Sequence, residues 1–279
     1  MNSFAYYNGS FGRREEINIP LSDRAVFFGD GVYDAAIGKM GKIFLAEEHI
    51  DRLLRNAKRM KIDHRLTRTA LSDILYDCVN KSGLDSFFLY FHITRNSARR
   101  IHSACSSDGA NLLVTVDEFS LPEPEKKISL ITAEDLRYYY CDVKTLNLLP
   151  AVIASTDAEE RGAYETVFIR GNVVTECAHS NISILKGGVL KTHPATNLIL
   201  PGITRRHLLL AAEALGIEYL EVPFTKSELF SADEVIVTST SKLLLLADKI
   251  DGIPVGGKDW KRAGALRDYL VGEFVHYYL

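Results

Sequence analysis

The chain has 279 residues, of which 47% are hydrophobic and 25% are charged, which is the ordinary composition of a globular protein with a core. The formal net charge of -3 gives no electrostatic basis for binding nucleic acid or an anionic membrane. The polar, turn-rich start of the sequence is unlike a secretory signal, and no apolar segment reaches the length that spans a bilayer.

The first part of the chain is predicted to mix strands and helices. Strand-forming composition and Gly-containing turns predict strands in these segments: residues 4–11, 35–44, 86–95 and 111–119. Apolar side chains at helical spacing predict helices over residues 46–62 and over about 67–81. Glu47 and Glu48 favour the start of the first of these helices, as the helix dipole prefers.

Residues 120–127, SLPEPEKK, are the best candidate for a linker, because they combine two prolines with four charges. We therefore expect a small N-terminal α/β domain over residues 1–119 and a larger C-terminal α/β domain over residues 128–279. The length of the chain fits one large domain or two modest ones.

The second part of the chain continues to alternate between the two kinds of element. A helix predicted over residues 145–162 contains Pro150, which should bend this helix or lie near its first turn. The remaining predicted elements are hairpins over 164–176 and 180–193, a helix over 204–216, a buried strand over 233–240 and a helix over 258–275.

The cysteines follow neither a disulfide pattern nor a zinc pattern. They are widely spaced, without a Cys-x-x-Cys pair: Cys78, Cys105, Cys141 and Cys177. Reduced thiols fit this pattern best, so we expect a cytoplasmic protein without a bound metal.

Lys144, in the stretch CDVKTLNLLPAV, stands at the entrance to an apolar segment. Its stem could pack there while its ammonium group reaches water, which is the common arrangement. A desolvated lysine, in contrast, loses proton affinity and becomes a usable nucleophile. The stretch by itself favours the first interpretation.

Two segments could bind a phosphate. In LPGITRRHLLL, a Pro-Gly turn leads into a helix that starts at Ile203 and Thr204, and exposed amides at a helix start suit an anion. In VTSTS, residues 237–241, hydroxyl groups follow a buried strand and can donate to phosphate oxygens. A plain N-cap and a solvated turn are the alternative interpretations, and taken singly they are the more common ones.

Two charged residues have apolar neighbours. Arg52 lies at the edge of a core-facing helix stripe, where it could pair with a carboxylate or clamp a phosphate. Glu176 follows VVT and precedes Cys177, and burial would raise its pKa unless a positive partner kept it ionised. A protonated pyridine nitrogen would be such a partner.

Together these features describe one ligand, pyridoxal 5′-phosphate. It has a phosphate for the helix start, the hydroxyl turn and Arg52, a ring nitrogen for Glu176, and an aldehyde for Lys144. The protein would position this cofactor, and the cofactor would act as the electron sink.

Motifs along nearly the whole chain resemble one family in the same order: SDRAVFFGDGVYDAA, EEHIDRLLRNA, DVKTLNLLPAVIAS, VVTECAHSNI, THPATNLILPGITR and ADEVIVTST. The sequence is similar to the class IV, or fold-type IV, pyridoxal-phosphate-dependent aminotransferases, and within them most similar to the D-amino acid aminotransferases. This resemblance implies a two-domain α/β (α+β) fold with the cofactor between the domains. It also implies a homodimer with active sites near the interface.

The resemblance further implies a role for each site residue. Lys144 would hold the cofactor as a Schiff base and move the proton between the substrate Cα and the cofactor. Glu176 would pair with the pyridine nitrogen, and Leu200 would pack against the ring. The phosphate would be held by Arg52, Ile203, Thr204, Ser239 and Thr240.

The segment TRNSARRIH, residues 94–102, is similar to the part of D-amino acid aminotransferases that holds the substrate carboxylate. Arg100 and His102 would bind the carboxylate together with Tyr33 of the GDGVY motif. In relatives this segment can reach into the partner subunit's site. A solvated basic loop and a packed strand aromatic are the alternative interpretations.

The expected reaction is transamination between a D-amino acid and a 2-oxo acid. Alternatives within the family are branched-chain L-amino acid transamination and aminodeoxychorismate lyase activity. Branched-chain enzymes place a tyrosine where this chain has Leu149, whereas Cys177 after the glutamate is common among the lyases. A silent protein that binds a phosphorylated ligand is a further alternative, against which Lys144 and Glu176 argue.

One stretch departs from the family pattern. After the hydroxyl turn, relatives carry a polar, proline-containing loop near the substrate side chain, whereas this chain has KLLLLADKIDG with Leu243 to Leu246 in a row. We expect this loop to influence the side-chain preference of the enzyme.

Overall fold

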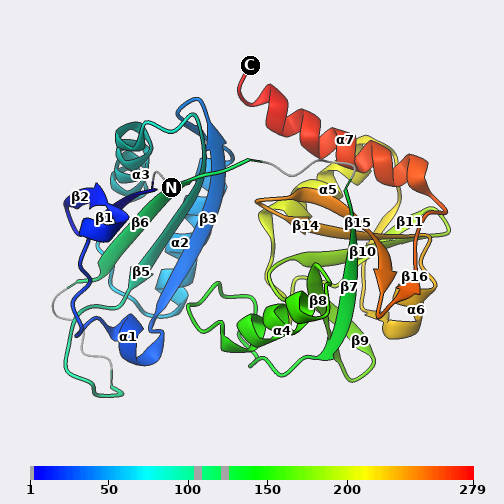
Figure 1. Cartoon of the computed structure of the whole chain (residues 1–279), viewed down its shortest axis with the longest axis horizontal. Helices are drawn as coiled ribbons and strands as arrows, with labels where there is room; N and C mark the ends of the chain where they lie inside the picture. Colours follow the sequence, from blue (N-terminus) through cyan, green and yellow to red (C-terminus); the bar gives the residue numbers. More distant parts are fainter. Residues whose placement is uncertain (1–2, 104–108, 121–125) are drawn as a thin grey trace. The chain divides into compact units, whose positions relative to one another are not determined.

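The structure, a computed structural model, describes residues 3–103, 109–120 and 126–279, and Figure 1 shows its elements in chain order. The contacts divide the chain into two compact units. The first comprises Met1–Ser120, Val143–Asn147 and Tyr278, and the second comprises Leu121–Asp142, Leu148–Tyr277 and Leu279. Residues 121–125 of the predicted linker lie outside the described residues.

The first unit is an antiparallel sheet packed against helices. Its described strands pair in the order β2-β1-β6-β5-β3-β4. The strands are β1 (Ser3–Tyr7), β2 (Ser10–Arg13), β3 (Gly31–Lys39), β4 (Lys42–Ile43), β5 (Ser86–Thr94) and β6 (Asn111–Glu118). The helices are η1 (Arg14–Glu16), α1 (Arg24–Phe28), α2 (Ala46–Arg59) and α3 (Arg68–Ser82).

The alternation of side chains along β5 explains how this sheet packs against α2 and α3. Successive side chains of a strand point to opposite faces, so Phe87, Leu89 and Ile93 share one face. These residues are fully buried in the same core cluster as Leu53 of α2 and Leu75 of α3. The apolar stripes of the two helices therefore cover one face of the sheet.

The second unit contains a mixed sheet whose described strands run in the order β12-β11-β10-β14-β15-β7-β8-β9-β13, with β16 paired to β15. Strands β15, β7 and β8 are parallel neighbours, as are β11 and β12, and the other pairs are antiparallel. The strands are β7 (Lys127–Glu134), β8 (Glu165–Arg170), β9 (Val173–Cys177), β10 (Asn181–Lys186), β11 (Val189–Thr192), β12 (Tyr219–Glu221), β13 (Phe224–Thr225), β14 (Glu234–Ser239), β15 (Leu243–Ile250) and β16 (Ile253–Pro254).

The helices of the second unit are α4 (Leu149–Glu160), α5 (Ile203–Ala214), α6 (Lys226–Phe230) and α7 (Trp260–His276). Helix α7 packs on α5 and on β15, whereas α4 packs on β8 (Figure 1). Strands β9 and β10 also contact each other, so the sheet curls around a core that includes Val167, Ile184 and Leu245. Among the described residues, none of the helices combines the length and the apolar character that a membrane crossing requires.

The helix predicted over residues 145–162 begins later than expected. The segment Val143–Asn147 contains bends and an isolated bridge to Val32, and it hydrogen-bonds to the start of β3, so helical structure begins only at Leu149. Pro150 lies in the first turn of α4, where the missing N–H of proline has no helical partner to lose. The prediction that Pro150 lies near a first turn is therefore confirmed, and the predicted start of the helix was wrong.

The leucine run is also different from the predicted loop. Residues Leu243 to Leu246 form the first half of β15 and pair with β14. Leu243, Leu244 and Leu245 are buried. A short apolar run between turns is typical of a strand that is buried on both faces. The expectation of a loop at this position was therefore wrong.

Replacing Leu245 by alanine tests this assignment. Leu245 is 1% exposed in the core of the second unit, and Leu245→Ala should lower the free energy of unfolding by about 2–5 kcal/mol. The matched control is Leu246→Ala, because Leu246 is only half-buried on the opposite face of the strand and should lose less than half as much. Urea unfolding of both variants gives the comparison, and equal losses would contradict the strand assignment.

Candidate active site

Lys144 lies in an irregular segment, Val143–Asn147, that hydrogen-bonds to the start of β3. The Tyr33 amide donates to the Lys144 carbonyl at 2.9 Å, and the Leu146 amide donates to the Gly31 carbonyl at 3.1 Å. These two hydrogen bonds flank Thr145 and hold the backbone at the lysine carbonyl and just after it. Its half-buried side chain places Nζ 4.3 Å from the centroid of the Tyr33 ring. The cationic group and the phenol therefore face each other within the first unit.

The glycines of the GDGVY motif make this pairing possible. A Cβ atom at Gly31 would lie 2.7 Å from both the Ile93 carbonyl oxygen and the Leu146 side chain. Only glycine therefore lets the Lys144 segment approach β3 so closely. Gly29 ends α1 with φ of +58°, a left-handed conformation that glycine adopts without strain.

Arg52 is buried and is held by a carboxylate. Its Nε donates to Asp34 Oδ2 at 2.7 Å, and its Nη2 donates to Asp34 Oδ1 at 2.8 Å. The Nδ1 atom of His49 lies 2.7 Å from the same Oδ1. Burial disfavours the charged form of Asp34, but Arg52 and then His49 outweigh it and hold the pKa of Asp34 well below its usual range. The guanidinium orientation is therefore fixed by a buried ion pair.

The pKa of His49 reports on the same cluster. Burial lowers this pKa, and the charge of Asp34 offsets the effect only in part. The positive charges of Arg52 and Lys144 lower it further. These effects favour the neutral form of His49 beside the two cations. Arg52 is therefore the cation that pairs with Asp34.

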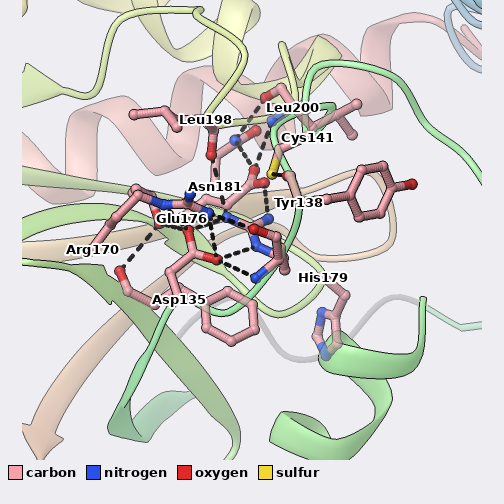
Figure 2. Close-up of polar contacts among 12 residues, drawn as sticks. Asp135, Tyr138, Cys141, Arg170, Glu176, His179, Asn181, Leu198 and Leu200 are labelled. Carbon is pink, nitrogen blue, oxygen red and sulfur yellow. Dashed lines mark hydrogen bonds and ion pairs between the residues drawn. The ribbon is translucent and has the colours of Figure 1, made fainter. Parts of the chain in front are cut away.

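Glu176 stands at the centre of a polar network in the second unit (Figure 2). Arg137 Nη1 donates to Oε1 of its carboxylate. Asn181 Nδ2 at 3.0 Å and the Leu200 amide at 2.9 Å donate to Oε2. Asn181 Nδ2 also lies 2.9 Å from the Leu200 carbonyl. The network therefore ties β9, β10 and the segment before α5 to one carboxylate.

Arg137 is the cation of this network. Asp135 accepts from its Nε at 2.9 Å and from its Nη2 at 3.0 Å, and the Leu198 carbonyl accepts from Nη2 at 3.2 Å. Burial disfavours its charge, but the hydrogen bonds to Asp135 and the charge of Glu176 prevail, so the pKa of Arg137 is raised. Sequence reasoning missed this residue, although the stretch EDLR carried the signal of an acid two positions before a base.

The helix start and the hydroxyl turn of the second unit were predicted as anion sites. Gly202 is the N-cap of α5, and no side chain of the described residues caps this helix. Ile203 and Thr204 are its first residues. Ser239 ends β14, and its Oγ is buried without a hydrogen-bond partner among the described residues. Unused donors thus occur at both predicted positions.

Asn181 connects these two positions. It pairs in register with Thr238 of β14, one residue before Ser239. Its Oδ1 lies so close to Gly202 that a Cβ there would approach it to 2.0 Å. The end of β14 and the start of α5 therefore flank the same asparagine, and Thr240 follows in the turn after β14.

The residues predicted to hold a substrate carboxylate form two separate groups, Tyr33 in one and Arg100 with His102 in the other. Tyr33 is half-buried in β3, contacts Lys144 and stacks on Tyr90 with centroids 5.5 Å apart. Arg100 and His102 are exposed in the loop after β5, and both lie against the ring of Phe28. In the part of the chain that the structure describes, the two sets share no contact.

A second buried carboxylate lies beneath the turn after Glu176. Glu165 accepts a hydrogen bond from the His179 amide at 2.6 Å and one from Ser180 Oγ at 2.8 Å. The His179 ring Nδ1 lies 3.0 Å from the carboxylate and can pair with it when protonated. Burial raises the pKa of Glu165 to about 7, and the hydrogen bonds lower it only in part.

This shift predicts a pH-dependent stability. A glutamate titrates near 4.3 when unfolded, so the contribution of protonated Glu165 is present below that pH and is lost as pH rises through about 7. Between pH 4 and 8, the free energy of unfolding of the wild-type protein should fall by on the order of 3 kcal/mol relative to that of Glu165→Gln. This follows because one pKa unit corresponds to about 1.4 kcal/mol.

Urea unfolding of both proteins across this pH range measures the difference. The matched control is Glu160→Gln, because Glu160 is exposed at the end of α4 and its replacement should leave the pH dependence as in the wild type. Parallel curves for wild type and Glu165→Gln would show that Glu165 titrates normally.

Comparison with known proteins covers almost the whole chain. The model of the family "Amino-transferase class IV" matches residues 31–250. The D-alanine aminotransferase of Bacillus licheniformis is 39% identical over 256 residues, which are 90% of this chain and 89% of that protein. The D-alanine aminotransferase of Listeria monocytogenes serotype 4b is 36% identical over 274 residues, which are 96% of this chain and 95% of that protein.

Comparison with solved structures supports the fold. The branched-chain amino acid aminotransferase of Escherichia coli superposes with a TM-score of 0.89 at 22% sequence identity. The superposition covers 97% of this chain and 94% of that one. The predicted two-domain α/β fold of type IV is therefore confirmed.

Proposed function

Because the chain belongs to the class IV aminotransferase family, we propose that it moves the amino group of a D-amino acid to a 2-oxo acid with the help of pyridoxal 5′-phosphate. The observation that carries the choice of substrate is the similarity to D-alanine aminotransferases along 90% or more of this chain. The E. coli branched-chain enzyme is only 22% identical, so its likeness supports the fold alone.

The second unit supplies donors that fit the phosphate of the cofactor. The buried Oγ of Ser239 and the first amides of α5, at Ile203 and Thr204, can each donate to a phosphate oxygen. The absence of a Cβ at Gly202 lets Asn181 lie directly against the start of the helix. We assign Thr240 to the same phosphate, since it follows Ser239 in the turn.

Arg52 is the phosphate ligand that we assign in the first unit. A guanidinium has five N–H groups in a fixed fork, and the contact with Asp34 uses two of them. The ion pair therefore fixes the orientation of the fork. Bidentate recognition by a pre-oriented arginine suits a phosphate dianion.

Glu176 is assigned to the ring nitrogen of the cofactor. Arg137, Asn181 and the Leu200 amide all donate to its carboxylate, and these donors favour its ionised form. An ionised carboxylate can accept the N–H of a protonated pyridine. Leu200, which is held to Glu176 through its backbone, is the residue that we assign to the face of the ring.

Lys144 is assigned as the lysine that carries the cofactor and moves the proton at the substrate Cα. When bound, pyridoxal phosphate supplies the electron sink that allows this proton to leave. The contacts of the Lys144 backbone with β3 fix the position from which its amine acts. Tyr33, Arg100 and His102 would hold the carboxylate of the amino acid and so orient its Cα–H bond toward the lysine.

We further propose that the protein is a homodimer in the cytoplasm. The face of the first sheet opposite its helices carries Phe88, Tyr90 and Leu113 around a hollow of about 470 Å³. Arg14, Thr115 and Asp117 also line this hollow. A sheet face that combines apolar rings with polar groups suits association with a second copy. Among the described residues, Cys78, Cys141 and Cys177 are free, as expected in a reducing compartment.

The role of Lys144 is tested by Lys144→Ala. The purified variant should lose the visible absorption band of the covalently held cofactor, and its transamination rate should fall by about 10²–10⁴-fold because the proton-transfer group is missing. Lys258→Ala is the control, since Lys258 is exposed in the loop before α7. A band and a rate that survive in Lys144→Ala would remove Lys144 from the reaction.

Substrate choice is tested by single-turnover spectra of the cofactor-loaded wild-type protein. D-alanine or D-glutamate should convert the visible band to that of the amino form of the cofactor, whereas L-leucine should leave it unchanged. Conversion by L-leucine alone would assign the protein to branched-chain transamination instead. A stable band with all three amino acids would contradict transamination of these substrates and favour the lyase.

A further inference from the structure

We infer that Arg24, Phe28 and Asp30 form a clamp that fixes the loop of Arg100 and His102, and that this clamp determines how tightly the substrate carboxylate is held. We call residues 95–103 the carboxylate loop. The inference rests on the proposed function, because the carboxylate role of Arg100 and His102 belongs to that proposal. The clamp residues would be positioning residues, which act through Arg100 and His102.

The ring of Phe28 is the platform of the clamp. Phe28 is the last residue of α1 and is half-buried. The guanidinium carbon of Arg100 lies 5.5 Å from its ring centroid, and the His102 ring centroid lies 5.4 Å away at 55°. Both predicted carboxylate ligands therefore rest on one aromatic ring, within the range of cation–π and ring–ring attraction.

Arg24 holds the backbone of the same loop. Its guanidinium carbon lies 4.6 Å from the Phe28 centroid, and its Nη1 donates to the Ile101 carbonyl at 2.7 Å. Its Nη2 lies 3.5 Å from the His102 carbonyl, which is a weaker contact. Arg24 is only 4% exposed, although it is a charged residue. A buried arginine of this kind needs partners, and the loop carbonyls are two of them.

Asp30 joins the two ends of the loop. It accepts from Arg24 Nε at 2.7 Å and from Arg95 Nε at 2.9 Å. Burial disfavours the charge of Asp30, but hydrogen bonds from Arg95 and Arg24 prevail and hold its pKa below the usual value. An ionised carboxylate thus connects Arg95, where the loop begins, to the arginine that holds Ile101 and His102.

Backbone hydrogen bonds complete the attachment. The Arg24 amide donates to the Asn96 carbonyl at 3.0 Å, and the Ala98 amide donates to the Ser22 carbonyl at 2.9 Å. The backbone of the loop is therefore held at several positions, while the side chains of Arg100 and His102 stay exposed. Ordering long side chains costs entropy, and a site that is ordered before the substrate arrives avoids that cost on binding.

The test compares Phe28→Leu with Phe27→Leu in the purified, cofactor-loaded protein. Phe28→Leu removes the ring but keeps an apolar side chain, and it should raise the KM for D-alanine about tenfold with little change in kcat, since ground-state and transition-state binding fall together. Phe27→Leu is the matched control, because Phe27 is the neighbouring ring in α1 and is 38% exposed. It should leave KM unchanged.

Hydrogen exchange gives a readout that does not depend on activity. Amides of the carboxylate loop should exchange faster in Phe28→Leu and in Arg24→Lys than in the wild type, with α3 as an unaffected internal reference. Arg24→Lys keeps the charge but cannot reach Asp30 and the loop carbonyls at the same time. Retention of the visible cofactor band in each variant shows that the variant is folded.

The outcomes separate the clamp from the proposed function. Unchanged exchange together with an unchanged KM overturns the clamp while D-amino acid transamination stands. Faster exchange without a rise in KM overturns the link to the carboxylate. A wild-type protein that converts no D-amino acid overturns the proposed function and the carboxylate part of the inference, and the exchange data then still decide whether the clamp holds the loop.

Discussion

Pairing of buried carboxylates with arginines is the constraint on which the candidate site depends. An isolated charge in a protein interior is costly, and a carboxylate is tolerated there only with a cation and hydrogen-bond donors around it. Asp34 with Arg52 meets this requirement in the first unit, and Glu176 with Arg137 meets it in the second. In each pair, one partner is a predicted cofactor ligand and the other is the residue that orients it.

These pairs also organise the backbone around them. Leu200 and Asn181 are fixed through the Glu176 carboxylate, and Asn181 in turn lies against Gly202 at the start of α5. A carboxylate that accepts several directed hydrogen bonds can satisfy all of them in few arrangements only. The position of the helix start relative to β9 and β10 therefore follows from the same network that favours the ionised form of Glu176.

Much of the fold could be predicted from the sequence, whereas the residues that orient the predicted ligands, Asp34 and Arg137, could not. The period of the apolar residues predicted α2, and the family resemblance, which the comparisons confirm, named Lys144, Arg52 and Glu176. Asp34 and Arg137 were missed as orienting residues because their partners Arg52 and Glu176 are 18 and 39 positions away. The stretch EDLR indicates the pair of Arg137 with Asp135, but no local pattern reports the contact with Glu176. The start of α4 was misplaced for the same reason, since backbone contacts with β3 hold the preceding residues in a non-helical conformation.

The carboxylate loop is held in a different way from the residues proposed as cofactor ligands. Arg52 and Glu176 are held through their side chains, so replacing either one disturbs a buried pair. Arg100 is exposed, and its loop is attached largely through carbonyl and amide groups that every residue type provides. The carbonyl and amide contacts of this loop therefore persist when its side chains change, whereas the contacts of Arg95 with Asp30 and of Arg100 and His102 with Phe28 depend on the residue type. Arg24 and Asp30, the charged groups that hold this loop, lie in α1 and just before β3, outside the loop itself. Under the proposed function, substitutions in the loop would therefore change substrate recognition while this support stays in place.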